Sequence, residues 1–383
     1  MKFQYVFRSH GSDIELAESD LCLPFKISPT KVHPFLTLRD YFDAIRSFLV
    51  ERMSDRLKWT LGEALGSTIS VGDMNRLLIR SEKHGAFNHV ASIEFITNKG
   101  TAKFALATFL SSSERWFRSE SANLERLQLV TSPYQFTPRL YLKGQYEITR
   151  NGQAETLFFL MSQWLEGFYE WHLHRDLKKN ECDVVIWDHD RGRRLASREE
   201  VQEIFYKIGF ILATCYDPEE YRRVGLWSNA AGDFVVGRRG SVTDILLTTV
   251  RDYSPVLDAQ QVKPGQSLMP MTFFFLETLT LIRLDREEGI GDLLWCEDWC
   301  LDWAVKGIFD AFEEKARQAK LPAAMPSEFI TVLKSFTPEE IKTLLQYTVT
   351  RLGNTNPELY KYVATRLGKY ADELYNTIQR SPI

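Results

Sequence analysis

The period of the hydrophobic pattern changes several times along this chain of 383 residues, and each change limits the fold. Residues 36–66 place apolar side chains on one helical stripe. Residues 75–109 instead form three short apolar runs, which are typical of strands. Between the last two runs, residues 97–101 predict a hairpin turn in which Gly100 supplies positive φ. The chain therefore combines helices with an antiparallel sheet.

A capping box at the start of the helix over residues 197–215 is a second local signal. Ser197 is followed three residues later by Glu200, so each side chain can bond the backbone N–H of the other. The remaining segments are predicted in this order: a helix from Ser111, strands over 139–142 and 156–161, the helix over 197–215, a hairpin over 234–250, and helices beyond Met271.

This order predicts an α+β fold with two lobes and an N-terminal extension. We expect a helical extension over residues 1–70, a small lobe with an antiparallel sheet over 71–165, and a mainly helical large lobe over 166–383. Two interpretations of the extension are open, because it can cap the small lobe or form the surface of a homo-oligomer.

The charge balance excludes several classes of partner. Lys and Arg number 47 against 51 Asp and Glu, a formal net charge of −4, so we expect neither nucleic acid nor a membrane as partner. The richest apolar stretch, 269–276, is too short to span a bilayer. Five cysteines do not form a disulfide framework in such a chain, and the N-terminus lacks the apolar core of a signal peptide. We therefore expect a reduced, cytoplasmic protein.

A Gly-Asp pair ahead of the second hairpin carries the strongest functional signal. The segment from Asn229 to Asp233 reads Asn-Ala-Ala-Gly-Asp, and Asp252, with an aromatic neighbour, follows nineteen positions after Asp233. This arrangement resembles the catalytic loop and metal-binding element of aminoglycoside-phosphotransferase-like kinases, which have a two-lobed protein-kinase-like fold. The resemblance implies that Asp233, with Asn229 in the same loop, accepts the proton of an attacking hydroxyl and that Asp252 holds Mg²⁺. The structural alternative is that Asp233 closes a tight turn and Asp252 caps the next segment.

The same resemblance assigns nucleotide-binding roles in the small lobe. Trp164 and Glu166 follow an apolar strand, at the place where the hinge of such kinases meets an adenine ring. Glu120 resembles the acidic helix residue that pairs with the phosphate-binding lysine, and the alternative is a solvated helix charge.

The position of the phosphate-binding lysine departs from the family. Lys103 lies at the start of its strand, whereas the family places the lysine near the middle. The loop over residues 80–89 has the position of the phosphate-covering loop but holds one glycine, so it would have to bind through side chains. Its candidate donors to an anion are Arg80, Lys83 and His84, and Lys83 can replace the missing lysine. The alternative is a solvated hairpin turn.

Residues 169–175 interleave aromatic, His and Glu side chains after the expected hinge. One interpretation is the lining of a substrate pocket, and the other is the start of a helix that buries Trp171. His172 and His174 would point to opposite sides of an extended segment, so we do not expect them to share a ligand.

Together these features predict a phosphotransferase that uses ATP and Mg²⁺ and acts on a small hydroxylated molecule. Two departures support the alternative, a pseudokinase-like protein that binds a ligand or partner without turnover. The middle of the strand lacks its lysine, and Arg238 stands where the family has an Asn, five residues after the catalytic Asp.

Overall fold

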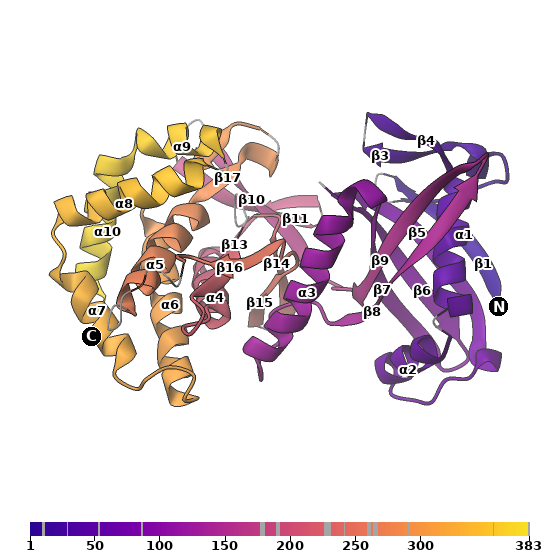
Figure 1. Cartoon of the computed structure of the whole chain (residues 1–383), viewed down its shortest axis with the longest axis horizontal. Helices are drawn as coiled ribbons and strands as arrows, with labels where there is room; N and C mark the ends of the chain where they lie inside the picture. Colours follow the sequence, from indigo (N-terminus) through magenta and orange to yellow (C-terminus); the bar gives the residue numbers. More distant parts are fainter. Residues whose placement is uncertain are drawn as a thin grey trace. The chain divides into compact units, whose positions relative to one another are not determined.

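A computed structural model divides the chain into two compact units, which are described separately (Figure 1). Unit 1 comprises Met1–Glu125 and Pro138–Glu166, and unit 2 comprises Arg126–Thr137 and Gly167–Ile383. The structure describes residues 1–9, 12–28, 30–52, 54–85, 87–176, 181–188, 192–225, 231–240, 242–258, 262, 267–289, 291–354 and 356–381.

A seven-stranded sheet with the order β2-β1-β5-β6-β7-β9-β8 forms the centre of unit 1. Strand β1 runs parallel to β5, and the other neighbours are antiparallel. A separate strand pair joins β3 to β4. The strands of unit 1 are β1 (Lys2–Ser9), β2 (Ser12–Glu15), β3 (Pro24–Ser28), β4 (Lys31–Thr37), β5 (Met74–His84), β6 (His89–Thr97), β7 (Gly100–Phe109), β8 (Leu140–Arg150) and β9 (Gln153–Gln163). Its helices are α1 (Leu38–Ser47), a π-helical turn (Phe48–Arg52), α2 (Ser54–Leu65) and α3 (Glu114–Val130), whose last residues count to unit 2.

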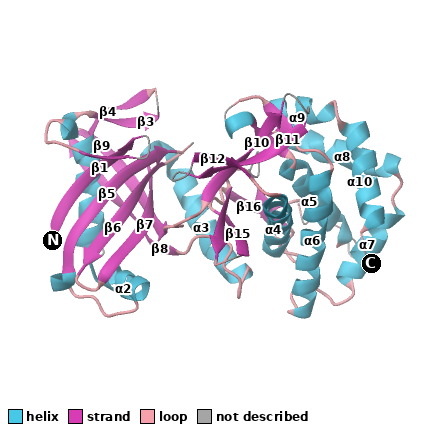
Figure 2. Cartoon of the chain, turned by 180° about the vertical axis from the view of Figure 1, so that it is seen from behind, coloured by secondary structure: helices cyan, strands magenta, loops and turns pink. Residues whose placement is uncertain are grey.

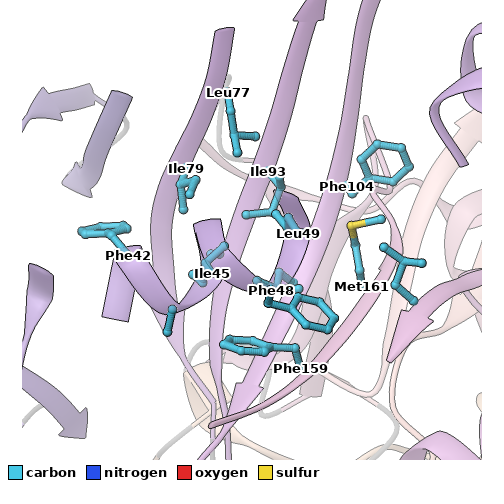
Figure 3. Packing of buried hydrophobic residues seen from close by; sticks show 14 of the residues in the cluster. Phe42, Ile45, Phe48, Leu49, Leu77, Ile79, Ile93, Phe104, Phe159 and Met161 are labelled. Atoms are coloured by element: carbon cyan, nitrogen blue, oxygen red, sulfur yellow. The ribbon is translucent and has the colours of Figure 1, made fainter. Parts of the chain in front are cut away.

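The core of unit 1 lies between α1 and one face of this sheet (Figure 3). The helix begins with a capping box in which the side chains of Thr37 and Asp40 bond each other's backbone N–H groups. Alternate residues of each strand point toward the helix, because side chains alternate between the faces of a sheet. The rings of Phe48 and Phe159, for example, stack with centroids 4.9 Å apart. The buried residues labelled in Figure 3 are Phe42, Ile45, Phe48, Leu49, Leu77, Ile79, Ile93, Phe104, Phe159 and Met161.

The expected helical extension over residues 1–70 is wrong for its first half. Four strands, β1 to β4, and a short 3-10 turn (Asp20–Cys22) precede Leu38, where the first α-helix begins. The physical reason is visible in β1, where Phe3 and Tyr5 alternate with polar residues and pack on the core. Tyr5 stacks on Phe42 of α1 with ring centroids 4.8 Å apart, so β1 completes the sheet over that helix.

Unit 2 combines a five-stranded sheet, in the order β12-β11-β10-β14-β15, with helices (Figure 2). The expected α+β class is therefore confirmed, and so is the hairpin over 234–250. The strands are β10 (Tyr169–Asp176), β11 (Glu181–Asp188), β12 (Gly192–Leu195), β13 (Arg222–Gly225), β14 (Phe234–Arg239), β15 (Val242–Leu247), β16 (Asp252–Pro255), β17 (Leu284–Arg286) and β18 (Leu293–Trp295). The helices are α4 (Arg198–Cys215), α5 (Leu268–Ile282), α6 (Trp299–Arg317), α7 (Met325–Ser335), α8 (Pro338–Gly353), α9 (Pro357–Ala364) and α10 (Leu367–Arg380).

The interpretation of residues 169–175 as a helix start is wrong, because they belong to β10. Trp171 is buried there, as that interpretation expected, but it is buried by a strand. The expectation that His172 and His174 point to opposite sides is also wrong, because residues two apart in a strand lie on the same face. His172 is buried beside Asp285 and His174 is exposed beside Glu287, so the two rings differ in burial and not in face.

The described helices of the chain include none that is long and apolar enough to cross a membrane. The apolar stretch over 269–276 lies in α5, a helix of 15 residues that is buried over most of its length. All five cysteines are free.

Helices α4 and α6 approach each other so closely that two glycines are required at their contact. A Cβ atom on Gly307 would lie 2.0 Å from the carbonyl oxygen of Tyr206, and one on Gly209 would lie 2.3 Å from that of Ala304. Because both obstacles are backbone atoms, they cannot turn away as the end of a side chain can.

We predict that Gly307→Ala lowers the free energy of unfolding by about 2 kcal/mol or more, since α4 and α6 must move apart. The matched control is Gly368→Ala in α10, where a Cβ atom meets nothing within 4 Å. That change should be neutral or stabilise by up to about 1 kcal/mol, because alanine is the better helix former. Denaturant unfolding of both variants measures the difference, and equal stabilities would contradict the close contact.

Candidate functional site

Three of the residues expected to bind the nucleotide lie together at the end of β9 in unit 1. The Lys103 ammonium is 4.0 Å from the centre of the Trp164 ring and 3.9 Å from the Glu166 carboxylate. The Trp164 indole N–H donates a hydrogen bond of 2.8 Å to the same carboxylate. The sheet causes this arrangement, because β7 and β9 pair Phe104 with Gln163 and so place Lys103 beside the residues that follow β9.

The middle of β7 is occupied by alanine where the family resemblance places a lysine. Ala105 and Ala107 alternate with the core residues of β7 and therefore lie on the same face of the sheet as Lys103. Ala107 packs against an apolar cluster together with Trp116 and Phe117 of α3. Glu120, one turn further along α3, is buried. Lys103 thus remains the only lysine of this strand, near its start.

Arg80 joins three strands and is held by acidic and hydroxyl partners. Its guanidinium donates to both carboxylate oxygens of Asp13, at 2.8 and 2.6 Å, and to the Ser92 hydroxyl at 3.0 Å. The Ser92 hydroxyl in turn donates to Glu82 at 2.6 Å. The hydrogen bonds from Arg80 hold the pKa of Asp13 below its ordinary value. This arginine is therefore a clamp between strands.

His84 is engaged by a second imidazole, whereas Lys83 is exposed at the end of β5. The Nδ1 atoms of His84 and His89 are 3.0 Å apart, and Nε2 of His89 is 3.0 Å from the Ser81 hydroxyl. Burial lowers the pKa of His89 to about 3. Burial also lowers the pKa of His84, and the positive charge of the nearby Lys26 lowers it slightly further. Because the two Nδ1 atoms face each other, one ring donates its Nδ1–H and the other accepts through Nδ1.

Asp233 lies directly before β14 in unit 2, after the left-handed turn at Gly232 (φ 83°). Its carboxylate is 6% exposed and lies 3.0 and 3.3 Å from one guanidinium nitrogen of Arg251. Burial raises the pKa of Asp233 to about 6, and Arg251 offsets part of that increase. Sequence reasoning missed Arg251, because its neighbour Asp252 carried the family signal.

Asp252 opens β16 and belongs to a different network. Its carboxylate accepts a hydrogen bond of 2.6 Å from Ser254 and lies 3.8 Å from Arg223. Arg223 also pairs with the buried Glu277 at 2.7 Å. Arg251 therefore holds Asp233, while the next residue along the chain faces Arg223, so the two carboxylates have separate partners.

The surroundings of Asp252 do not fit Mg²⁺. A guanidinium at 3.8 Å opposes a divalent cation, which needs several oxygen ligands and few positive neighbours. Within the described ranges no group of three His, Cys, Asp or Glu side chains has the spacing of a metal site. Asn229, the second expected catalytic residue, lies outside the described residues.

Comparison with known proteins adds little. No family model and no curated protein matches the chain. One similar solved structure is a protein from Haemophilus somnus 129PT that carries the provisional name fructosamine-3-kinase. It is 11% identical over 86% of this chain and 99% of that chain, with a TM-score of 0.27. A likeness of that size carries no argument about fold or activity.

The environment of Asp233 predicts a pH dependence of stability. Because its pKa is about 6 in the folded chain against an ordinary value of 3.8, the unfolded chain releases this proton first as the pH rises. The contribution of Asp233 to the free energy of unfolding therefore decreases as the pH rises from about 4 to about 6.

In Asp233→Asn this loss is absent, so the stability of the variant relative to the original chain should rise over that interval by up to about 3 kcal/mol. Arg251→Met removes the cation that offsets the effect of burial, so the pKa of Asp233 should rise further. The decrease in the free energy of unfolding should then continue to higher pH. Urea unfolding between pH 4 and pH 8 measures both, and a difference that stays constant with pH would refute the assignment.

Proposed function

We propose that this chain is a protein-kinase-like protein that binds an ATP-type nucleotide through unit 1 and does not transfer phosphate. The observation that carries the proposal is that both expected catalytic carboxylates are engaged by other side chains of the protein. Asp233 is buried against Arg251, and Asp252 is engaged by Ser254 and faces Arg223.

The nucleotide side of the proposal rests on the contacts of Lys103. Its ammonium, the Trp164 indole and the Glu166 carboxylate meet where the resemblance places the adenine-binding hinge. The flexible stem of a lysine allows its charge to leave Trp164 and meet a phosphate oxygen. Glu120 keeps the role that the resemblance implies, and Lys83 and His84 remain side-chain donors to the anionic part of the nucleotide.

Three features support the absence of transfer. Alanine fills the middle of β7, Arg238 stands where the family has a metal-binding Asn, and the surroundings of Asp252 do not fit Mg²⁺. Phosphoryl transfer depends on positioning and on neutralisation of phosphate charge, and each of these features removes a part of that machinery.

A phosphotransferase that moves phosphate from ATP to a small hydroxylated acceptor is the second candidate. The pKa of Asp233, raised to about 6 by burial, favours it. A proton acceptor works best when its pKa lies near the working pH, and an ordinary aspartate lies well below that range. In this candidate Asp233 accepts the proton of the acceptor hydroxyl, with Asn229 in the same loop, and Asp252 holds Mg²⁺.

Nucleotide binding is tested by thermal unfolding of the full chain with ATP, ADP and no ligand, with and without Mg²⁺. We expect ATP to raise the melting temperature to a similar extent with and without Mg²⁺. Lys103→Met should weaken binding by about tenfold, since it removes one charge-assisted contact. Lys143→Met is the matched control, because Lys143 is an exposed lysine of the same sheet, paired with Glu125 at 2.7 Å.

Transfer is tested separately with labelled ATP and a panel of hydroxylated small molecules, including sugars and aminoglycosides. We expect no product above that of Asp233→Asn. Mg²⁺-dependent product that disappears in Asp233→Asn, while nucleotide binding persists, would establish the second candidate instead. The absence of any stabilisation by ATP would remove both.

A further inference from the structure

A hollow of about 280 Å³ lies over β10, β11 and β12 of unit 2. The pairing of β11 with its neighbours places Val185 opposite both His172 and Leu195, and Trp187 opposite Arg193. Because side chains alternate along a strand, these residues lie on one face of the sheet. Two histidines and two arginines are among the eight described residues that line the hollow, and none of the eight is acidic.

A buried carboxylate fixes the histidine at the base of this hollow. Asp285 of β17 is 1% exposed, accepts the backbone N–H of Leu173 at 2.7 Å, and lies 3.1 Å from Nδ1 of His172. His172 is itself 5% exposed. Because Nδ1 is engaged by Asp285, Nε2 is the ring nitrogen left for a ligand.

A glycine packs closely on the same ring. Gly289 has φ +78°, and a Cβ atom on it would lie 3.0 Å from Cε1 and 3.3 Å from Nε2 of His172. A side chain at this position would press on the Cε1 edge of the ring. The positive φ favours glycine for a second, independent reason.

The walls of the hollow combine a flat aromatic surface with a cation. The rings of His172 and Trp187 have centroids 4.3 Å apart, and the guanidinium of the exposed Arg193 lies over Trp187 at 4.9 Å. Val185 and Leu195 add aliphatic surface. The lining thus has an apolar part and a basic part, and within the basic part Arg194 is paired with Glu200 at 2.7 Å and His174 lies 3.8 Å from Glu287.

We propose that this hollow binds a small organic anion, namely a carboxylate or phosphate group on a flat apolar body. The body lies against Trp187, Val185 and Leu195, and the anionic group meets Nε2 of His172 and the guanidinium of Arg193. A protonated imidazole donates from both nitrogens, so His172 then bridges Asp285 and the ligand. This site is independent of the nucleotide proposal, since none of its residues belongs to unit 1.

The test uses the full chain with labelled histidine, because an NMR spectrum that correlates ring nitrogens and protons reports on each of its seven histidines. His172→Gln assigns the His172 signals. Benzoate and phenyl phosphate are the two anionic probes, and benzyl alcohol is the neutral probe of similar shape. We expect a saturable shift of the His172 Nε2 signal with at least one anion and none with benzyl alcohol. The comparison of the two anions tells a carboxylate site from a phosphate site.

The contribution of the cation is measured with Arg193→Met, which should lower the affinity for the anion by about tenfold or more. Arg317→Met is the control, because Arg317 is an exposed arginine of α6 in the same unit. Arg193 is exposed, so its variant reports on binding even if His172→Gln does not fold. No saturable shift with either anion, an equal shift with benzyl alcohol, or equal affinity in Arg193→Met would overturn the proposal. ATP-dependent stabilisation should be the same in Arg193→Met as in the original chain, which keeps the two proposals separable.

Discussion

A buried carboxylate must find a positive partner, and unit 2 is organised around this requirement. An ionised acid removed from water costs several kcal/mol unless a cation and hydrogen bonds compensate it. Asp233, at 6% exposure, meets the requirement with Arg251. Three further buried acids of the unit are paired as follows: Glu200 with Arg194, Glu277 with Arg223, and Asp285 with His172.

The identity of the partner decides what a paired acid can still do. Arginine only donates hydrogen bonds and stays charged, so the carboxylate that it covers is stabilised in place. Histidine differs, because its ring has a second nitrogen on the opposite edge. In the pair of Asp285 and His172, the second ring nitrogen can therefore still bind a ligand. In the pair of Asp233 and Arg251, both charged groups serve each other. This difference is why we propose ligand binding at His172 and no phosphate transfer at Asp233.

Local signals in the sequence predicted the helix α4 and the hairpins of β6 with β7 and of β14 with β15, since such signals depend on neighbours along the chain. Ser197 and Glu200 form the expected capping box, and Gly100 adopts positive φ (136°) in the expected hairpin. The strands β1 to β4, β10 to β13 and β16 to β18 were missed, although Phe3 and Tyr5 of β1 do alternate with polar residues.

The partners of the charged side chains could not be predicted in the same way. Arg251 and Asp252 are adjacent in the sequence, yet one holds Asp233 and the other faces Arg223. Only the tertiary structure decides between such partners. The grouping of Lys103 with Trp164 and Glu166 is the reverse case, because two paired strands bring together residues that the family resemblance had named separately.

The alternation of β7 explains why its lysine lies near the start of the strand and not in its middle. Positions 103, 105 and 107 share one face, and position 107 packs in an apolar cluster with Trp116 and Phe117 of α3. An ammonium group at that position would enter the apolar cluster and would need a buried acid to compensate it. Aromatic packing under the middle of β7 and a phosphate-binding lysine there therefore exclude each other. The cation of this strand lies instead at position 103, where an indole face and an exposed carboxylate can receive it without burial.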